Sequence, residues 1–235
     1  MKKTLAFAFL SVLLLLVSST AAAAGKLTVT QENVLVLPYE TYFRGELYLE
    51  VQNTGDKAVQ MNGGLFELMD ASGTVVSSVD LANYDLSPEV LQPGEYGYLH
   101  RSVDLNEIKS SSEIGSYLVN VTGKGIVNAD VTRFPAAARY ESGTGADGSR
   151  KDYIVAIITN NTDRTVYDFN VGFEFLDDSG NLLFTITGYW TYTGILAGSS
   201  IEVYMDVPDN VTAYWVENGI KPASANAVAF ITSYR

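Results

Sequence analysis

The sequence predicts an all-β protein in which two antiparallel β-sandwich domains follow one another along the chain. Apolar and polar residues alternate in several short runs, as in the segment with Leu47, Leu49 and Val51 on one face. The phrase Phe66–Gly73 (FELMDASG) returns almost unchanged as Phe173–Gly180 (FEFLDDSG). Turn-forming Asn, Asp and Gly residues separate the runs, which is the pattern of short strands in a sandwich.

Residues 1–24 have the order of a secretory signal peptide. Lys2 and Lys3 are followed by an apolar run from Leu5 to Val17 and by three alanines that end at Ala24. The run is short of the roughly 20 residues of a membrane span, although an uncleaved anchor is the alternative. We expect cleavage after Ala24 and a bacterial protein that is secreted or otherwise extracytoplasmic, in the periplasm or at the cell surface, with no transmembrane segment after signal removal.

Charge and cysteine content restrict the function. The formal charge is −12, and two of the 15 basic residues lie in the predicted leader, so nucleic acid is not an expected partner. The acidic surface gives solubility or, alternatively, attracts a cation or a basic partner. The chain has no Cys, which excludes thiol catalysis and Cys-based zinc sites, and its length allows two cores without disulfides.

The repeated phrase is part of a longer internal similarity. At one constant offset Asn53 pairs with Asn160, Phe66 with Phe173, Asp70 with Asp177, and Gly73 with Gly180. Similarity over the length of a domain indicates tandem copies of one fold, because solenoid repeats are much shorter. The predicted domains are residues 25–125 and 129–235, with a brief linker around residues 123–129 that leaves little freedom between them.

Each repeated phrase is interpreted as one arm of a β-hairpin and its turn. Asp70 and Gly73, like Asp177 and Gly180, occupy the first and fourth positions of a type I turn. The carboxylate accepts backbone N–H groups, and glycine takes a positive φ at the exit. The repetition therefore has a structural meaning.

These residues resemble FxLYD domains, which are named for a strand motif Phe-x-Leu-Tyr-Asp. The motif is found as Phe66-Glu-Leu-Met-Asp70 and Phe173-Glu-Phe-Leu-Asp177, so both copies lack the Tyr and the second also replaces the Leu. The resemblance covers about half of the chain. It implies two tandem immunoglobulin-like sandwiches, commonly extracytoplasmic in prokaryotes, with no established activity and no binding residues to carry over.

Catalytic chemistry finds little support in the sequence. The single imidazole, His100, lies on a predicted strand, where a cross-strand or surface role is expected. No Gly-x-Ser-x-Gly turn or phosphate-binding loop is present, and paired carboxylates cannot be recognised from spacing. We expect neither an enzyme nor a cofactor. The segments 143–152 and 176–181 have a calcium-loop composition without the ligand spacing, so calcium and plain turns both stay open.

Aromatic clusters are the remaining candidates for binding. One cluster holds Tyr189, Trp190 and Tyr192, and the other holds Tyr39, Tyr42 and Phe43. Aromatic faces pack in strands, anchor protein partners or stack on sugars, and all three interpretations stay open. The leading hypothesis is a non-enzymatic module that contacts a protein or a cell-envelope component. The alternative is a carbohydrate-binding module that uses these Tyr and Trp side chains.

The two copies also differ on one strand face. The outward residues Glu46, Tyr48 and Glu50 of the first copy correspond to Tyr153, Val155 and Ile157 in the second. The polar outward face of the first copy predicts exposure to solvent, and the apolar face of the second predicts a cover. The first domain, the segment 213–223 and an external partner are the possible covers.

Overall fold

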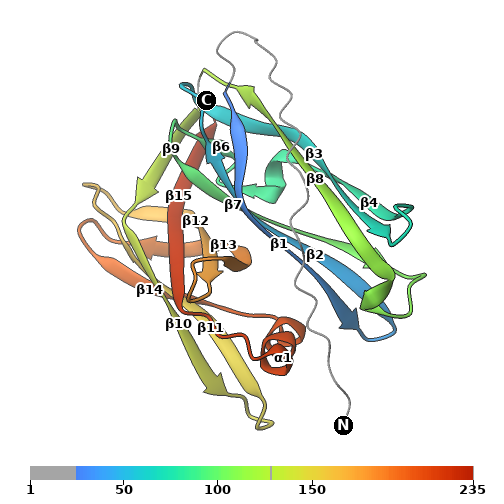
Figure 1. Ribbon diagram of the computed structural model, residues 1–235. Coiled ribbons are helices and arrows are strands. Elements are labelled where there is room, and N and C mark those ends of the chain that lie inside the picture. Colours follow the sequence, from blue (N-terminus) through green and yellow to red (C-terminus); the bar gives the residue numbers. More distant parts are fainter. Residues whose placement is uncertain (1–24, 128, 235) are drawn as a thin grey trace.

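The computed structural model describes residues 25–127 and 129–234, and it confirms the all-β class (Figure 1). The strands form four antiparallel sheets, which pair into two sandwiches. The predicted leader, residues 1–24, lies outside the described residues.

Two sheets from residues 27–125 form the first sandwich. Sheet 1 has the order β1-β2-β7-β5, in β1 (Leu27–Tyr39), β2 (Tyr42–Asn53), β7 (Tyr96–Leu105) and β5 (Leu86–Ser87). Sheet 2 is built on β3 (Val59–Asp70), which pairs with β4 (Val75–Leu81), β6 (Val90–Leu91) and β8 (Ile114–Gly125). Short 3₁₀ turns η1 (Asn83–Asp85) and η2 (Ser111–Glu113) lie in the connections. As the alternation predicts, Leu47, Leu49 and Val51 are buried in the core of this sandwich.

The second sandwich is built from residues 129–234. Sheet 3 has the order β10-β11-β14, in β10 (Ala136–Thr144), β11 (Arg150–Thr159) and β14 (Ser200–Asp206). Sheet 4 has the order β13-β12-β15-β9, in β13 (Leu182–Ile195), β12 (Val166–Leu176), β15 (Ser224–Tyr234) and β9 (Ala129–Phe134). Between β9 and β10 the chain changes sheets at Pro135, which cannot donate to a strand ladder. The alternating Phe169, Val171, Phe173 and Phe175 of β12 are fully buried.

Both predicted hairpin turns are confirmed. The Gly73 N–H donates to the Asp70 carbonyl over 3.0 Å, and the Gly180 N–H donates to the Asp177 carbonyl over 3.1 Å. Both glycines have positive φ, +83° and +81°. Hydrogen bonds from the Ser72 side chain and the Thr74 backbone lower the pKa of the Asp70 carboxyl. The carboxylates therefore hold the turns, and the motif residues Phe66 and Phe173 lie in the two cores.

A buried asparagine closes the same end of each sandwich. The Asn53 side chain donates to the carbonyls of Lys57 (2.7 Å) and Leu91 (2.9 Å). The Asn160 side chain donates to the carbonyls of Arg164 (2.7 Å) and Ile195 (2.8 Å). Each amide donates to one buried carbonyl, that of Leu91 or Ile195, and to one part-buried carbonyl, so loss of either amide would leave a buried polar group unpaired.

The helix α1 (Asp209–Asn218) was not predicted from the sequence. It overlaps the segment 213–223, which the sequence analysis names only as a possible cover of the second copy's strand. It begins after Pro208 and ends at Gly219, whose φ of +67° gives the left-handed cap. Its Trp215 packs against Phe175 and Phe184 at one end of the second core.

The prediction about the outward strand faces is confirmed at Val155 but wrong at Ile157 and for the first copy. Val155 is buried, but Ile157 is 43% exposed, so β11 has an open patch on its outer face. The covered outward face belongs to the first copy, where Tyr48 is 1% exposed and Glu46 is buried as well. The reason is that the first sandwich packs onto sheet 4 with the outward face of sheet 1, and leaves the outer face of sheet 3 uncovered at Ile157.

We expect Gly180→Val to destabilise the fold more than Ser179→Val. A Cβ at Gly180 would have no neighbour within 4 Å, so the penalty comes only from the positive φ and amounts to about 1–2 kcal/mol. The measurement is the free energy of unfolding in urea. Equal values for the two variants would contradict the turn as the source of the effect.

Candidate ligand-binding site

The candidate site lies where the two sandwiches meet, which we call the domain seam. At the seam the outward faces of β2 and β7 in sheet 1 pack on β12 and β13 in sheet 4 (Figure 1). Leu35, Leu37 and Tyr48 of the first sandwich join the core cluster of the second. The Tyr48 ring lies 4.9 Å from the Phe184 ring. The two sandwiches therefore share apolar packing.

Polar contacts also join the two sandwiches at several points. The Asn33 side chain donates to the Leu183 carbonyl, and the Thr185 hydroxyl donates to the Leu99 carbonyl, both over 2.8 Å. These bonds satisfy polar groups that the packing removes from water. They also fix the position of sheet 4 relative to sheet 1.

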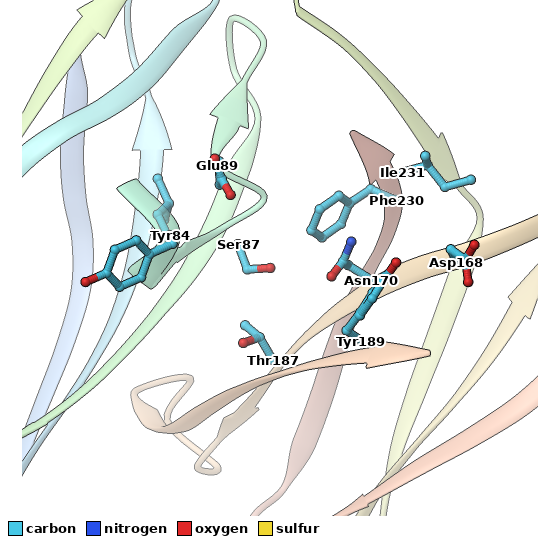
Figure 2. Close-up of a pocket in the computed structure, with 10 residues that line it drawn as sticks. Tyr84, Ser87, Glu89, Asp168, Asn170, Thr187, Tyr189, Phe230 and Ile231 are labelled. Carbon is cyan, nitrogen blue, oxygen red and sulfur yellow. The ribbon is translucent and has the colours of Figure 1, made fainter. Parts of the chain in front are cut away.

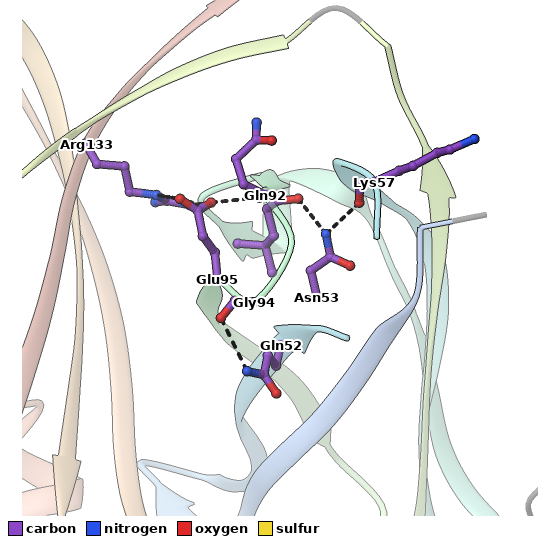
Figure 3. A network of polar contacts seen from close by, with 8 residues as sticks. Gln52, Asn53, Lys57, Gln92, Gly94, Glu95 and Arg133 are labelled. Carbon is purple, nitrogen blue, oxygen red and sulfur yellow. Dashed lines mark hydrogen bonds and ion pairs between the residues drawn. The ribbon is translucent and has the colours of Figure 1, made fainter. Parts of the chain in front are cut away.

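A bidentate ion pair between Arg133 of β9 and Glu95 closes one end of the seam (Figure 3). The Gln92 N–H also donates to the Glu95 carboxylate over 2.7 Å. Burial raises the pKa of Glu95, but the hydrogen bonds from Arg133 and Gln92 outweigh it and leave the pKa below its usual range. Glu95 therefore stays ionised down to acidic pH and keeps the pair intact.

The seam contains a pocket of about 320 Å³ to which both sandwiches contribute (Figure 2). The first sandwich contributes Tyr84, Leu86, Ser87 and Glu89, and the second contributes Asp168, Asn170, Thr187, Tyr189, Phe230 and Ile231. In the close-up Tyr84, Ser87 and Glu89 lie on one side, and Asn170 and Tyr189 lie on the other. The pocket therefore exists only while the sandwiches are docked.

A β-bulge places Asp168 at the pocket. The pairing of β12 with β13 shifts between Tyr167 and Phe169, and Asp168 takes a φ of +54°, which Asp tolerates better than most residues. The sequence carries a signal for this bulge. Val166 and Phe169 are apolar residues three positions apart, which breaks the two-residue alternation of β12, and both are buried.

The lining favours a neutral or positively charged polar ligand. Tyr84 and Tyr189 offer largely exposed rings, and Ser87, Asn170 and Thr187 offer hydroxyl and amide groups. The charged residues of the lining are carboxylates, Glu89 and Asp168, which disfavour an anion. The Glu89 carboxylate accepts a hydrogen bond from the Asn83 side-chain amide over 3.1 Å, which fixes its position.

Only part of the first predicted aromatic cluster lies at this site. Tyr189 lines the pocket. Trp190 is stacked on Phe169 (centroids 5.9 Å apart) and edge-on to Phe173, so it has a packing role. Tyr192 belongs to β13, but its side chain lies outside the described ones. Tyr84, Asp168 and Asn170 are lining residues that the sequence reading missed, because only the docking of the sandwiches brings them together.

The second aromatic cluster forms the tip of the β1–β2 hairpin. The rings of Tyr39 and Tyr42 lie 5.4 Å apart, and the Arg44 guanidinium lies over the Tyr39 ring at 4.2 Å. Phe43 instead packs against the core of the first sandwich. None of these three aromatic residues belongs to the pocket lining, so the structure does not combine the two clusters into one site.

The other candidate residues have structural partners. The His100 imidazole stacks on Tyr48, and its Nε2 lies 2.8 Å from the Glu46 carboxylate, in the cross-strand role that was predicted. The Asp147 carboxylate accepts the Ser149 N–H, and the Asp177 carboxylate accepts the N–H groups of its own turn. Among the described residues, no group of three or more His, Cys, Asp or Glu side chains is placed to hold a metal ion.

No protein-family model matches the chain, and no curated protein matches it significantly. The resemblance to FxLYD domains therefore stays an expectation that rests on the two motifs. Across residues 25–127 and 129–234, no helix has the length and apolar character needed to cross a membrane.

Gly172 on β12 offers a direct test of the seam. A Cβ there would lie 3.0 Å from the Tyr98 ring and 3.4 Å from the Ser87 carbonyl oxygen, so a larger side chain would push the sandwiches apart. We expect Gly172→Leu to cost about 1–3 kcal/mol and to separate the unfolding of the two sandwiches in calorimetry.

The control for this test is Gly143→Leu. Gly143 is an exposed strand glycine whose Cβ would make only an ordinary contact, at 3.5 Å. Unchanged cooperativity in Gly172→Leu, or the same loss in Gly143→Leu, would contradict the tight seam.

Proposed function

We propose that this protein is a non-enzymatic, extracytoplasmic binding protein that contacts another protein or a cell-envelope component through its two-sandwich body. The seam pocket is the observation that carries the proposal, because it has open tyrosine rings and polar groups from both sandwiches. Tyrosine combines an apolar face with a polar end, which suits an adaptable binding surface. The leader pattern of residues 1–24 supports the location.

The chemistry of the lining restricts the partner. With Glu89 and Asp168 in the lining and a formal charge of −12 on the chain, phosphate-rich and sulfated partners are disfavoured. A neutral surface, or a basic side chain such as lysine that can lie on a tyrosine face, is compatible with the same lining.

Carbohydrate binding is the second candidate, and the composition of the pocket favours it specifically. Sugars are bound by aromatic faces together with amide, hydroxyl and carboxylate groups, and the pocket contains all of these in Tyr84, Tyr189, Asn170, Thr187 and Asp168. The volume of about 320 Å³ is that of a small ligand site, so one sugar unit or one side chain of a partner would enter it.

Two pairs of tyrosines with equal exposure test both candidates. Tyr84 and Tyr204 are each 67% exposed, and Tyr189 and Tyr167 are each 58% exposed, but only Tyr84 and Tyr189 line the pocket. We expect Tyr84→Ala and Tyr189→Ala to lower the affinity for envelope material by about 10-fold or more, because each removes a ring from the pocket. Tyr204→Ala and Tyr167→Ala should leave the affinity unchanged.

The measurement is binding of cell-envelope extract to the immobilised protein, followed by a glycan array. Binding that survives protease treatment, appears on the array and is lost with Tyr189→Ala would select the carbohydrate candidate. Binding that protease abolishes would select a protein partner. An equal effect of all four variants, or of none, would remove the pocket from the proposal.

A further inference from the structure

A buried pair of carboxyl groups lies at the domain seam, beside the pocket. One face of β12 carries Asn170, Gly172 and Glu174 in turn. Asn170 lines the pocket, Gly172 lets Tyr98 approach, and Glu174 is 2% exposed beneath the first sandwich. Glu174 faces Glu50 of β2 and the hydroxyl of Tyr98 on β7.

One oxygen of Glu174 is satisfied and the other is not. Oε1 accepts a hydrogen bond from the Asn226 amide over 2.6 Å. Oε2 is buried without a hydrogen-bond partner. An ionised carboxylate in that position would be both desolvated and repelled by Glu50, whereas a protonated one can donate Oε2–H to the facing carboxylate.

Among the described residues, the arginines on the opposing strands are already paired with other acids. Arg44 of β2 lies 2.8 Å from Asp104, and Arg101 of β7 lies 3.3 Å from Asp85. The other charged or titratable groups on these strands are Tyr42, Glu46, Tyr48 and Glu50 of β2 and Tyr96, Tyr98 and His100 of β7. His100 lies against Glu46 at 2.8 Å, and the nearest groups on β15 and β13 are the neutral side chains of Asn226 and Thr185. Burial is the main cause that raises the pKa of Tyr98, and the charge of Glu174 raises it further. Tyr98 therefore stays neutral as well.

We propose that Glu174 keeps its proton when the sandwiches are docked, by donating it in a hydrogen bond to Glu50, and that this proton makes the docking of the two sandwiches pH-dependent. Docking then takes up a proton, and loss of the proton leaves two facing carboxylates that push the seam apart. The pocket residues come from both sandwiches, so the same step controls whether the pocket is assembled.

The direction of the effect follows from the two states of Glu174. Burial is the largest cause that raises the pKa of Glu174 from 4.5 to about 7, and the charge of Glu50 adds to it, although the Asn226 amide and the Tyr98 hydroxyl oppose them. An undocked, hydrated Glu174 would have its ordinary pKa. The protonated pair therefore supports docking fully below about pH 4.5, and this support is lost as the pH rises through about 7.

The test uses the absence of native cysteine. Thr185→Cys places the chain's single thiol at a fully buried position of the seam. A thiol reagent can label this cysteine only when the seam opens. Dividing its labelling rate by the rate for a cysteine in an unfolded peptide at the same pH therefore gives the extent of seam opening. We expect opening to rise on the order of 100-fold between about pH 5 and pH 8. Met61→Cys, buried in the first core, reports unfolding of that sandwich and should not follow the same curve.

Glu174→Gln in the Thr185→Cys background should flatten the pH dependence, because glutamine keeps the shape and does not titrate. Glu67→Gln is the matched control: Glu67 occupies the repeated motif of the first copy, but it is only half-buried and accepts from Ser78. If Glu174→Gln does not fold, Glu50→Gln serves instead, and removal of the facing charge should move the midpoint to lower pH. An unchanged curve in both variants, or a flat curve in the parent, would overturn the proposal.

Discussion

The burial of the outward face of sheet 1 is the constraint on which the rest of the structure depends. Tyr48, Leu35 and Leu37 project away from the first core and become part of the second core beside Phe184. Exposed together, they would form an apolar patch, so the second sandwich gains stability by covering them. This docking positions β12 against β7, and the pocket and the carboxyl pair both result from it.

Docking also buries polar groups, and the seam shows two ways in which they are accommodated. Asn33, Thr185 and the Arg133–Glu95 pair find partners across the seam, so their burial costs little. Glu174 has a partner for one oxygen only, and its neighbour Glu50 is an acid. A seam held by apolar packing, neutral hydrogen bonds and one ion pair can tolerate one such group, and that group then becomes the most pH-sensitive point of the interface.

The sequence predicted features that depend on local patterns. The alternation in β2 and β12, the turns at Asp70 and Asp177, and the cross-strand place of His100 all follow from neighbouring residues. It did not predict α1, because ten residues with a weakly amphipathic pattern give little local signal. It also assigned the cover to the wrong strand face, since Tyr48 beside Glu46 and Glu50 resembles an ordinary solvent-facing pattern.

Glu67 and Glu174 show why the site itself could not be predicted. They occupy the same position of the repeated phrase, and the phrase alone predicts one outward-facing residue for both. Glu67 keeps partial contact with solvent and accepts from Ser78, whereas Glu174 lies under the first sandwich. What distinguishes them is the opposing surface, and that surface is set by packing between distant segments. The pocket and the burial of Glu174 both depend on the docking of the two sandwiches, so a variant that keeps both folds but separates them should lose the pocket and the proposed Glu174 proton together.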